Sequence, residues 1–209
     1  MSPIVLVPYR DRAENLKQFI PVIKDFIEDA KIFVVEQADD KPFNKGALFN
    51  SGFRETEKLG GYFILHDIDL LPRKGTVDYS YCDFPTHLSA HCSQFNYKLP
   101  YENIFGGVVV VNAAHYEAVN GFPNSLRGWG AEDDLFYQSF IAKGIEVKRK
   151  YGWFESLPHR RYIDRTDYMH NVGLYRQGRN FDDGLTTCKY KLLSLESNDM
   201  YTHLKIQIE

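Results

Sequence analysis

Residues 61–75 read GYFILHDIDLLPRKG, and they set the fold question for the whole chain. The run 62–65 is apolar and aromatic, which is typical of a buried strand, and two carboxylates, Asp67 and Asp69, follow it. On an extended chain, residues two apart point to the same side, so these charges repel each other unless a cation lies between them. Such tripeptides are common, so the motif alone favours a strand that ends in a solvated loop; the alternative is a divalent metal site at the end of a sheet strand.

The composition limits the class of protein. A chain of 209 residues with 44% hydrophobic and 15% aromatic residues is long enough for one sizeable core, so we expect a single domain over residues 1–209. Lys and Arg number 25 against 28 Asp and Glu, which gives a net charge of -3 and no basic field for nucleic acid or anionic lipid. The longest uncharged apolar stretch, 104–111, is far shorter than the roughly 20 residues of a membrane span. We therefore expect a small or neutral partner.

The cysteines and the first residues bear on the compartment. Cys82, Cys92 and Cys188 are few and odd in number, which argues against a disulfide framework and fits a reducing compartment. Residues 4–12, IVLVPYRDR, are typical of a first core strand and not of a signal peptide. These features predict free thiols and a soluble, cytoplasmic protein.

Short apolar strands alternate with amphipathic helices along the chain, a pattern typical of an α/β fold with a central, mostly parallel sheet flanked by helices. Strands are expected at 4–7, at 32–37, directly before Asp67, at 104–112 and, as an alternating half-exposed edge strand, at 201–209. Helices are expected at 13–30, within 43–61, at 113–121 and near 132–144, and Pro21 should kink or restart the first of them.

Three polar clusters fall where strands or loops meet helices. The segment 8–12 (PYRDR) follows the first strand, 67–69 (DID) follows the third, and 128–134 (GWGAEDD) precedes the last long helix. Each has an ordinary explanation, such as solvated arginines or acidic residues at a helix N-terminus. In an open α/β sheet, however, ligands bind beyond the carboxyl ends of the strands. The three clusters together therefore favour a ligand site.

Longer motifs give a specific resemblance. The matching segments, in order along nearly the whole chain, are PYRDRAENL (8–16), FNKGALFNSGF (43–53), DIDLLP (67–72), PYENIFGGV (100–108), NGFPNSLRGWGAEDD (120–134) and DDGLTTCKYKLL (182–193). In these segments the chain resembles the β1,4-galactosyltransferase family of inverting, metal-dependent enzymes with the GT-A glycosyltransferase fold. The resemblance implies transfer of a hexose, GalNAc or Gal, from a UDP-sugar to a sugar hydroxyl of a glycan or glycoconjugate, with a β1,4 linkage expected.

The resemblance also implies a donor site. The residues expected to bind the donor are Pro8, Tyr9, Arg10, Arg12, Phe43, Asp67, Asp69, Ile104 and Gly107. The segment 8–12 matches the part of the family that surrounds the uridine and contacts the diphosphate. Guanidinium groups are suited to binding phosphate oxygens there. Phe43 matches the aromatic residue that packs against the uracil.

The expected metal ligands are Asp69 and His159, with Asp67 nearer the sugar nucleotide. Near that histidine, where relatives carry a methionine or a second histidine, this chain has Ser156 and Leu157. Water or His170 is the expected replacement. Carboxylate, imidazole and diphosphate oxygens favour Mn²⁺, with Mg²⁺ as the alternative.

The GWGAEDD segment matches the catalytic and acceptor loop. The resemblance assigns catalytic roles to Trp129, Glu132 and Asp133, with Asp133 as general base, and acceptor contacts to Tyr101, Trp129 and Asp134. Ala131 stands where most relatives carry a second glycine. The segment 159–177 matches a lid that orders over the bound donor, although its poor periodicity is equally typical of a surface loop.

One position bears on the choice of donor. Ile104 stands where galactose-transferring relatives usually present a tyrosine beside the C2 substituent of the sugar. A branched aliphatic side chain leaves room for an N-acetyl group, whereas a tyrosine ring obstructs it. We therefore expect UDP-GalNAc to be used at least as well as UDP-Gal.

Other interpretations stay open at this point. A phosphohydrolase of the aspartyl-phosphate type would place Thr or Ser soon after the second Asp, but residues 70–72 are Leu, Leu and Pro. A transferase that uses UDP-glucose or UDP-xylose and a non-catalytic sugar-nucleotide or glycan-binding module are the remaining rivals. Cys82 falls near a family disulfide cysteine, but its partner region, 61–67, contains none. The expected enzyme therefore lacks the usual Golgi anchor; the Golgi lumen is the alternative if an anchor has been removed.

Overall fold

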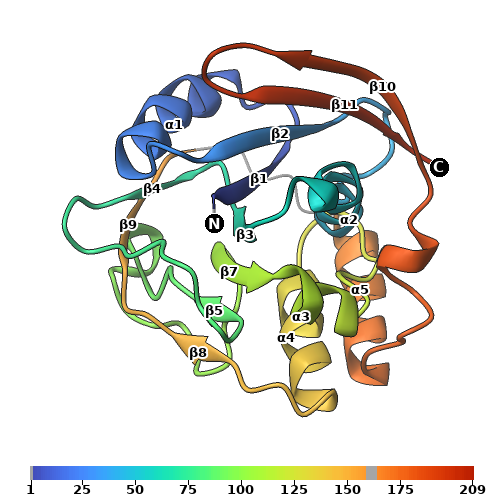
Figure 1. The fold of residues 1–209 in the computed structure, drawn as a ribbon. Helices are drawn as coiled ribbons and strands as arrows, with labels where there is room; N and C mark the ends of the chain where they lie inside the picture. Colours follow the sequence, from blue (N-terminus) through green and yellow to red (C-terminus); the bar gives the residue numbers. More distant parts are fainter. Residues whose placement is uncertain (1, 159–163) are drawn as a thin grey trace.

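The structure is a computed structural model that describes residues 2–158 and 164–209 (Figure 1). The helices are α1 (Ala13–Phe26), α2 (Lys45–Thr56), α3 (Ala113–Ala118), α4 (Glu132–Ala142) and α5 (Arg165–Gln177), with short 3-10 turns at Glu57–Leu59, Ser93–Phe95 and Leu185–Thr187. The strands are β1 (Pro3–Tyr9), β2 (Lys31–Gln37), β3 (Tyr62–His66), β4 (Leu70–Pro72), β5 (Thr86–His87), β6 (His91–Cys92), β7 (Val108–Asn112), β8 (Lys148–Arg149), β9 (Trp153–Ser156), β10 (Tyr190–Ser197) and β11 (Thr202–Ile208).

The larger sheet has the strand order β10-β11-β2-β1-β3-β7-β5-β8. Its centre is parallel, since β2 pairs with β11 and with β1, and β1 pairs with β3. On one side of this centre, β7 runs antiparallel to β3 and β5, and on the other β10 runs antiparallel to β11. The predicted α/β architecture with a central sheet is therefore confirmed. The strands that precede two of the expected ligand-binding segments, β1 and β3, lie in its parallel part.

Helices cover both faces of the sheet (Figure 1). Because side chains alternate along β1, Ile4 and Leu6 pack with α2, α3 and α4, while Val5 and Val7 pack with α1. Burial of these strands on both faces explains why their sequences are continuous apolar runs. The helix α1 continues through Pro21 without restarting and ends at Phe26, before the predicted boundary.

Two strand predictions need correction. The alternation at 201–209 does mark a strand with one buried face, but β11 lies inside the sheet and β10 is the edge strand. The strand predicted at 104–112 begins only at Val108, because Gly106 and Gly107 form a loop in which Gly107 has a φ of +88°. This loop brings the backbone close to the predicted catalytic residues.

Two further elements frame the predicted site. A small sheet, β4-β9-β6, begins directly after Asp69, so β4 and β9 hold residues 70–72 against 154–156. The second element is α5, which occupies 165–177 where an irregular lid or surface loop was expected. His159 lies outside the described residues.

Candidate active site

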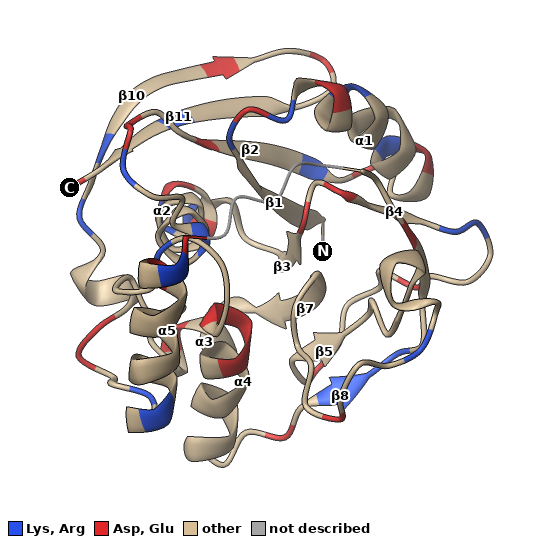
Figure 2. Cartoon of the chain, turned by 180° about the vertical axis from the view of Figure 1, so that it is seen from behind, with Lys and Arg blue, Asp and Glu red and all other residues tan. Residues whose placement is uncertain are grey.

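The acidic run predicted to be catalytic opens α4. Glu132, Asp133 and Asp134 form its first turn, which Figure 2 shows as an acidic helix start. The positive end of a helix dipole stabilises carboxylates at this place. The residue before them, Ala131, has a φ of +72°, a left-handed conformation that favours glycine. This chain therefore holds Ala131 in a strained backbone conformation.

Lys45 joins the two acidic clusters. Its ammonium group lies 3.0 Å from Asp67 Oδ1, 3.0 Å from Asp133 Oδ1 and 3.9 Å from Glu132 Oε1. It also contacts the second oxygen of Asp133 at 3.1 Å. Only 12% of the Lys45 side chain is exposed. One nearly buried cation is thus shared by three carboxylates from two different segments of the chain.

Burial and charge together shift the pKa values of this cluster. Burial, together with the neighbouring charge of Asp133, raises the pKa of Glu132 to about 7. Burial also raises the pKa of Asp133, while Lys45 opposes the shift. Burial alone would lower the pKa of Lys45, but the three carboxylates outweigh it and raise this pKa well above its ordinary value. The site therefore combines a fixed cation with one carboxyl group, Glu132, that takes up a proton near neutral pH, and a second, Asp133, whose pKa is raised.

The two aspartates of the DxD motif lie in a turn between β3 and β4. The amide of Leu70 donates to the carbonyl of Asp67 at 3.3 Å, so the expected extended arrangement of this tripeptide is wrong. The amide of Asp67 donates to the carbonyl of Gly107, and the amide of Leu157 donates to the carbonyl of Asp69. The turn is therefore fixed on one side by the glycine loop and on the other by the chain segment that leads towards His159.

The residues present fit a hard divalent cation in part. Asp69 supplies carboxylate oxygens, which Mn²⁺ and Mg²⁺ both accept, and the anchored Leu157 precedes His159 by two positions. Among residues 2–158 and 164–209, no group of three or more His, Cys, Asp and Glu is arranged as a metal site. His170 lies exposed on α5. A full coordination shell would thus need His159 or the oxygens of a bound diphosphate.

The predicted acceptor residues meet above the start of α4. The hydroxyl of Tyr101 donates to Asp134 at 2.8 Å. Trp129, with 47% of its surface exposed, stacks on Tyr168 of α5 with ring centroids 5.8 Å apart. The buried Asn171 of α5 donates to the carbonyl of Arg127 at 2.7 Å. The helix α5 therefore holds the tryptophan loop from one side, leaving the indole accessible.

Ile104 is fixed through its backbone. The side chain is partly buried, and the carbonyl of Ile104 accepts a hydrogen bond from Arg149 Nη2 at 3.0 Å. The same nitrogen of Arg149 also donates to the carbonyl of Glu102 at 2.7 Å. This strand β8 arginine thus holds the loop between Tyr101 and the glycines in place.

The expected uridine-binding residues are brought together only in part. The guanidinium of Arg10 lies 5.3 Å from the centre of the Phe43 ring and donates to the carbonyl of Lys41. Gly128 donates to the carbonyl of Phe43 at 2.7 Å, which links this part of the site to the tryptophan loop. Pro8 is buried in β1, and the carbonyl of Arg12 accepts from Leu16 in the first turn of α1.

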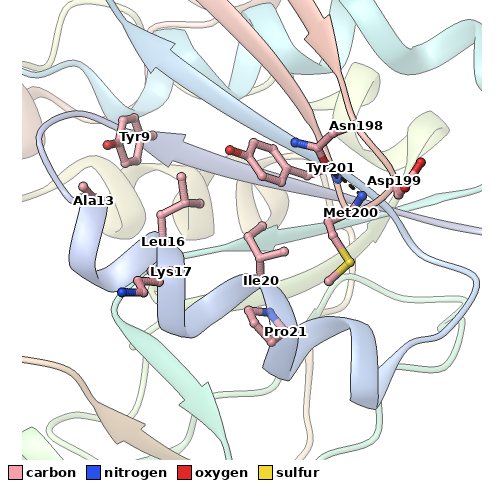
Figure 3. A pocket seen from close by; sticks show the side chains of 10 residues that line it. All are labelled: Tyr9, Ala13, Leu16, Lys17, Ile20, Pro21, Asn198, Asp199, Met200 and Tyr201. Carbon is pink, nitrogen blue, oxygen red and sulfur yellow. Dashed lines mark hydrogen bonds between the residues drawn. The ribbon is translucent and has the colours of Figure 1, made fainter.

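Tyr9 lies elsewhere. It lines a hollow of about 490 Å³ between α1 and the turn that joins β10 to β11, together with Leu16, Ile20 and Tyr201 (Figure 3). The ring of His203 meets Tyr9 edge-on at 6.1 Å. In this structure, the Tyr9 ring therefore lines the hollow and contacts His203.

Sequence reasoning missed Lys45. It lies inside the quoted segment FNKGALFNSGF, as the first residue of α2, and its signal was available as the cation that two facing acidic clusters require. The three cysteines are free, as predicted, with Cys92 and Cys188 buried. Within the described ranges, no helix has the length and apolar character needed to cross a membrane.

Comparison with known proteins places these features in a family. A model described as the N-terminal region of glycosyl transferase group 7 matches residues 2–83, and one described as the N-terminal domain of galactosyltransferase matches residues 86–161. The β1,4-galactosyltransferase 1 of Mus musculus is 31% identical over 98% of this chain and 54% of its own length. The β1,4-galactosyltransferase 6 of Rattus norvegicus is 33% identical over 98% of this chain and 56% of its own length. The chain thus spans about half the length of these curated relatives.

Solved structures agree with this match. The catalytic domain of Drosophila β1,4-galactosyltransferase 7 in complex with xylobiose superposes with a TM-score of 0.87 at 31% identity, covering 100% of this chain and 94% of that one. A mutant of the same Drosophila enzyme, in complex with manganese, UDP-Gal and xylobiose, gives a TM-score of 0.83 at 29% identity over the same shares of the two chains. The chain therefore has the GT-A fold and belongs to the β1,4-galactosyltransferase family.

Proposed function

We propose that this chain is an inverting glycosyltransferase that moves a hexose from a UDP-sugar to a sugar hydroxyl. The observation that carries the proposal is the position of Asp133. Its carboxylate is partly buried, bound by Lys45, and joined through that lysine to Asp67 in the turn after β3. A general base and the donor-binding motif therefore share one charged centre at the carboxyl end of the sheet.

In the proposed reaction, Asp133 takes the proton of the acceptor hydroxyl. The oxygen of that hydroxyl forms a bond to the anomeric carbon from the face opposite UDP, and the bond between that carbon and the diphosphate oxygen breaks. One displacement of this kind inverts the configuration of the sugar. The raised pKa of Asp133 makes its carboxylate a better proton acceptor than an ordinary aspartate.

Further residues have supporting roles in this proposal. Trp129 and Tyr101 provide accessible aromatic surface on which an acceptor sugar can lie. The Drosophila relative binds xylobiose, which makes xylosides the first acceptors to test here. Asp69 and His159 would hold Mn²⁺, or Mg²⁺ as the alternative, and such a cation, when bound, neutralises charge on the leaving diphosphate.

The first experiment is UDP release from UDP-Gal, UDP-GalNAc, UDP-glucose and UDP-xylose, with a xyloside acceptor, in Mn²⁺ or in chelator. We expect Mn²⁺ to raise the rate at least tenfold for UDP-Gal or UDP-GalNAc, because the diphosphate leaves as a highly charged group. Donor binding measured in the same buffers separates the alternatives. Binding without release, with every acceptor, would favour a non-catalytic sugar-nucleotide module.

Replacement of Ile104 tests the choice of donor. We expect Ile104→Tyr to shift the ratio of UDP-GalNAc to UDP-Gal turnover about tenfold towards UDP-Gal, because the larger ring fills the room beside C2. Ile104→Leu is the matched control, since it keeps an aliphatic side chain of the same volume. The two kcat/KM values are measured for each variant. A ratio that stays constant in Ile104→Tyr would mean that this position does not sense the C2 substituent.

A further inference from the structure

The carboxylate of Asp133 lies directly on the glycine loop before β7. A Cβ atom added to Gly106 would stand 2.3 Å from Asp133 Oδ2, so the carboxylate packs against the bare Cα of this residue. On its other side, the same carboxylate is held by Lys45 at 3.0 Å. The position of the Gly106 backbone therefore sets one wall of the space that Asp133 occupies.

Two buried side chains, those of His87 and Ser89, hold the backbone of Gly106 through hydrogen bonds. The carbonyl of Gly106 accepts hydrogen bonds from Ser89 Oγ at 3.0 Å and from His87 Nε2 at 2.9 Å. The hydroxyl of Ser89 in turn accepts from the amide of Val108 at 2.9 Å. His87 is fully buried and Ser89 is 4% exposed. A carbonyl with two buried donors is fixed far more firmly than an ordinary loop carbonyl.

The chemistry of His87 fits this task. Because a carbonyl only accepts, Nε2 carries the proton, and the ring is assigned as the neutral Nε2-H tautomer from this contact. Burial, together with the charge of Arg149 on the neighbouring strand, lowers the pKa of His87 to about 3. The donor to Gly106 therefore stays in one protonation state throughout the neutral range.

We propose that His87 and Ser89 are positioning residues for Asp133: by fixing the carbonyl of Gly106, they hold the loop against which the carboxylate packs. The inference rests on the proposed role of Asp133 as general base. Neither side chain contacts Asp133 in the hydrogen-bond network described above, so both act through the backbone of Gly106. Their loss should leave donor binding in place and misplace the base.

Ser89→Ala is the direct test. We expect kcat to fall about 10- to 100-fold, as for a base displaced by a fraction of an ångström, while the KM and the binding constant for the donor change less than threefold. Ser51→Ala is the matched control: Ser51 is also buried, and its hydroxyl donates to the carbonyl of Leu48 within α2. We expect Ser51→Ala to keep kcat within twofold.

His87 offers a test by conservative rescue. His87→Gln keeps an N–H donor at a similar reach and should retain most of the wild-type kcat, whereas His87→Phe removes the donor and should lower kcat as Ser89→Ala does. Circular dichroism and the urea midpoint establish that each variant is folded. Equal losses in His87→Gln and His87→Phe would contradict the hydrogen-bond role.

A double-mutant cycle separates positioning from general destabilisation. In an Asp133→Asn background, Ser89→Ala should cause no further loss of the residual rate, because the group that it positions can no longer act. Additive losses would overturn the inference while leaving the proposed function intact. A wild-type protein that transfers no sugar to any acceptor would instead overturn the proposed function itself.

Discussion

Asp133→Asn is expected to lower kcat about 1,000-fold with a change in donor KM of no more than a few-fold. The amide has the shape of the carboxylate and still fits between Lys45 and Gly106, but it cannot take the acceptor proton. Initial rates of UDP release with a saturating acceptor measure the effect, and single-turnover rates establish that the chemical step is the one that slows.

Asp134→Asn is the matched control for this result. It removes the same charge from the same helix turn, so any effect on the helix dipole is shared. Asp134 accepts a hydrogen bond from the hydroxyl of Tyr101. We therefore expect mainly a higher KM for the acceptor, with kcat lowered less than tenfold. If Asp133→Asn kept more than a tenth of the wild-type kcat, the base would lie elsewhere. Glu132, whose pKa is raised to about 7, would then be the next candidate.

Sequence patterns predicted the central layers well because those layers are built by burial. The strands β1, β2 and β3 are buried on both faces and have continuous apolar sequences, which a periodicity argument detects. The two-residue strands β5, β6 and β8 carry no such signal, since pairing with distant strands defines them. The edge strand β10 was missed because none of its residues is buried and its apolar residues do not keep to one face, since Leu193 and Leu195 are exposed.

The helix α5 was missed for a different reason. Its only buried residue within the described helix is the polar Asn171, so it lacks the apolar stripe that predicts a helix. Hydrogen bonds between Asn171 and the backbone of Arg127 hold it in place. A contact of this kind depends on two segments 44 residues apart and leaves no local pattern.

The candidate site divides in the same way. Asp67 and Asp69 could be placed at a ligand site because they follow the end of a sheet strand. The roles of Glu132 and Asp133, which begin a helix, followed from the family resemblance. Lys45 was missed, although two facing acidic clusters require a cation, because its partners lie 22 and 88 residues away and a single lysine in a helix is ordinarily solvated. His87 and Ser89 are likewise recognisable only once the glycine loop is seen to lie over them.

Lys45→Met is expected to lower the free energy of unfolding by about 3 kcal/mol at pH 8. The substitution keeps the shape of the side chain but leaves the carboxylates of Asp67, Glu132 and Asp133 without their shared cation. We choose the lower end of the range for a broken buried pair because Asp67 and Asp133 remain 28% and 24% exposed. Urea denaturation of the wild type and the variant measures the difference.

The loss should depend on pH. The pKa values of Glu132 and Asp133 are already raised in the folded protein, and Lys45 opposes this rise. Without Lys45, these two pKa values rise further above their unfolded values. A carboxyl group with a raised folded pKa favours the folded state below its unfolded pKa and loses that contribution as pH rises through the folded pKa. The destabilisation by Lys45→Met is therefore expected to become smaller as the pH falls from 8 through 7, where Glu132 takes up its proton. The kcat should fall as well, and recover in part as the pH is raised, because the loss of Lys45 favours the protonated form of Asp133.

Two controls separate charge from packing in this prediction. Lys45→Arg keeps the cation and should retain most of the stability. Lys74→Met removes a lysine that pairs with Asp25 at 3.5 Å but is 88% exposed, so the expected loss is below about 0.5 kcal/mol. The contrary result would be a urea midpoint for Lys45→Met equal to that of the wild type at pH 8. The three carboxyl groups would then have to be neutral or hydrated in the absence of Lys45. The charged centre that joins Asp67 to Asp133 would then not depend on Lys45, and the argument that this lysine couples the donor motif to the base would be wrong.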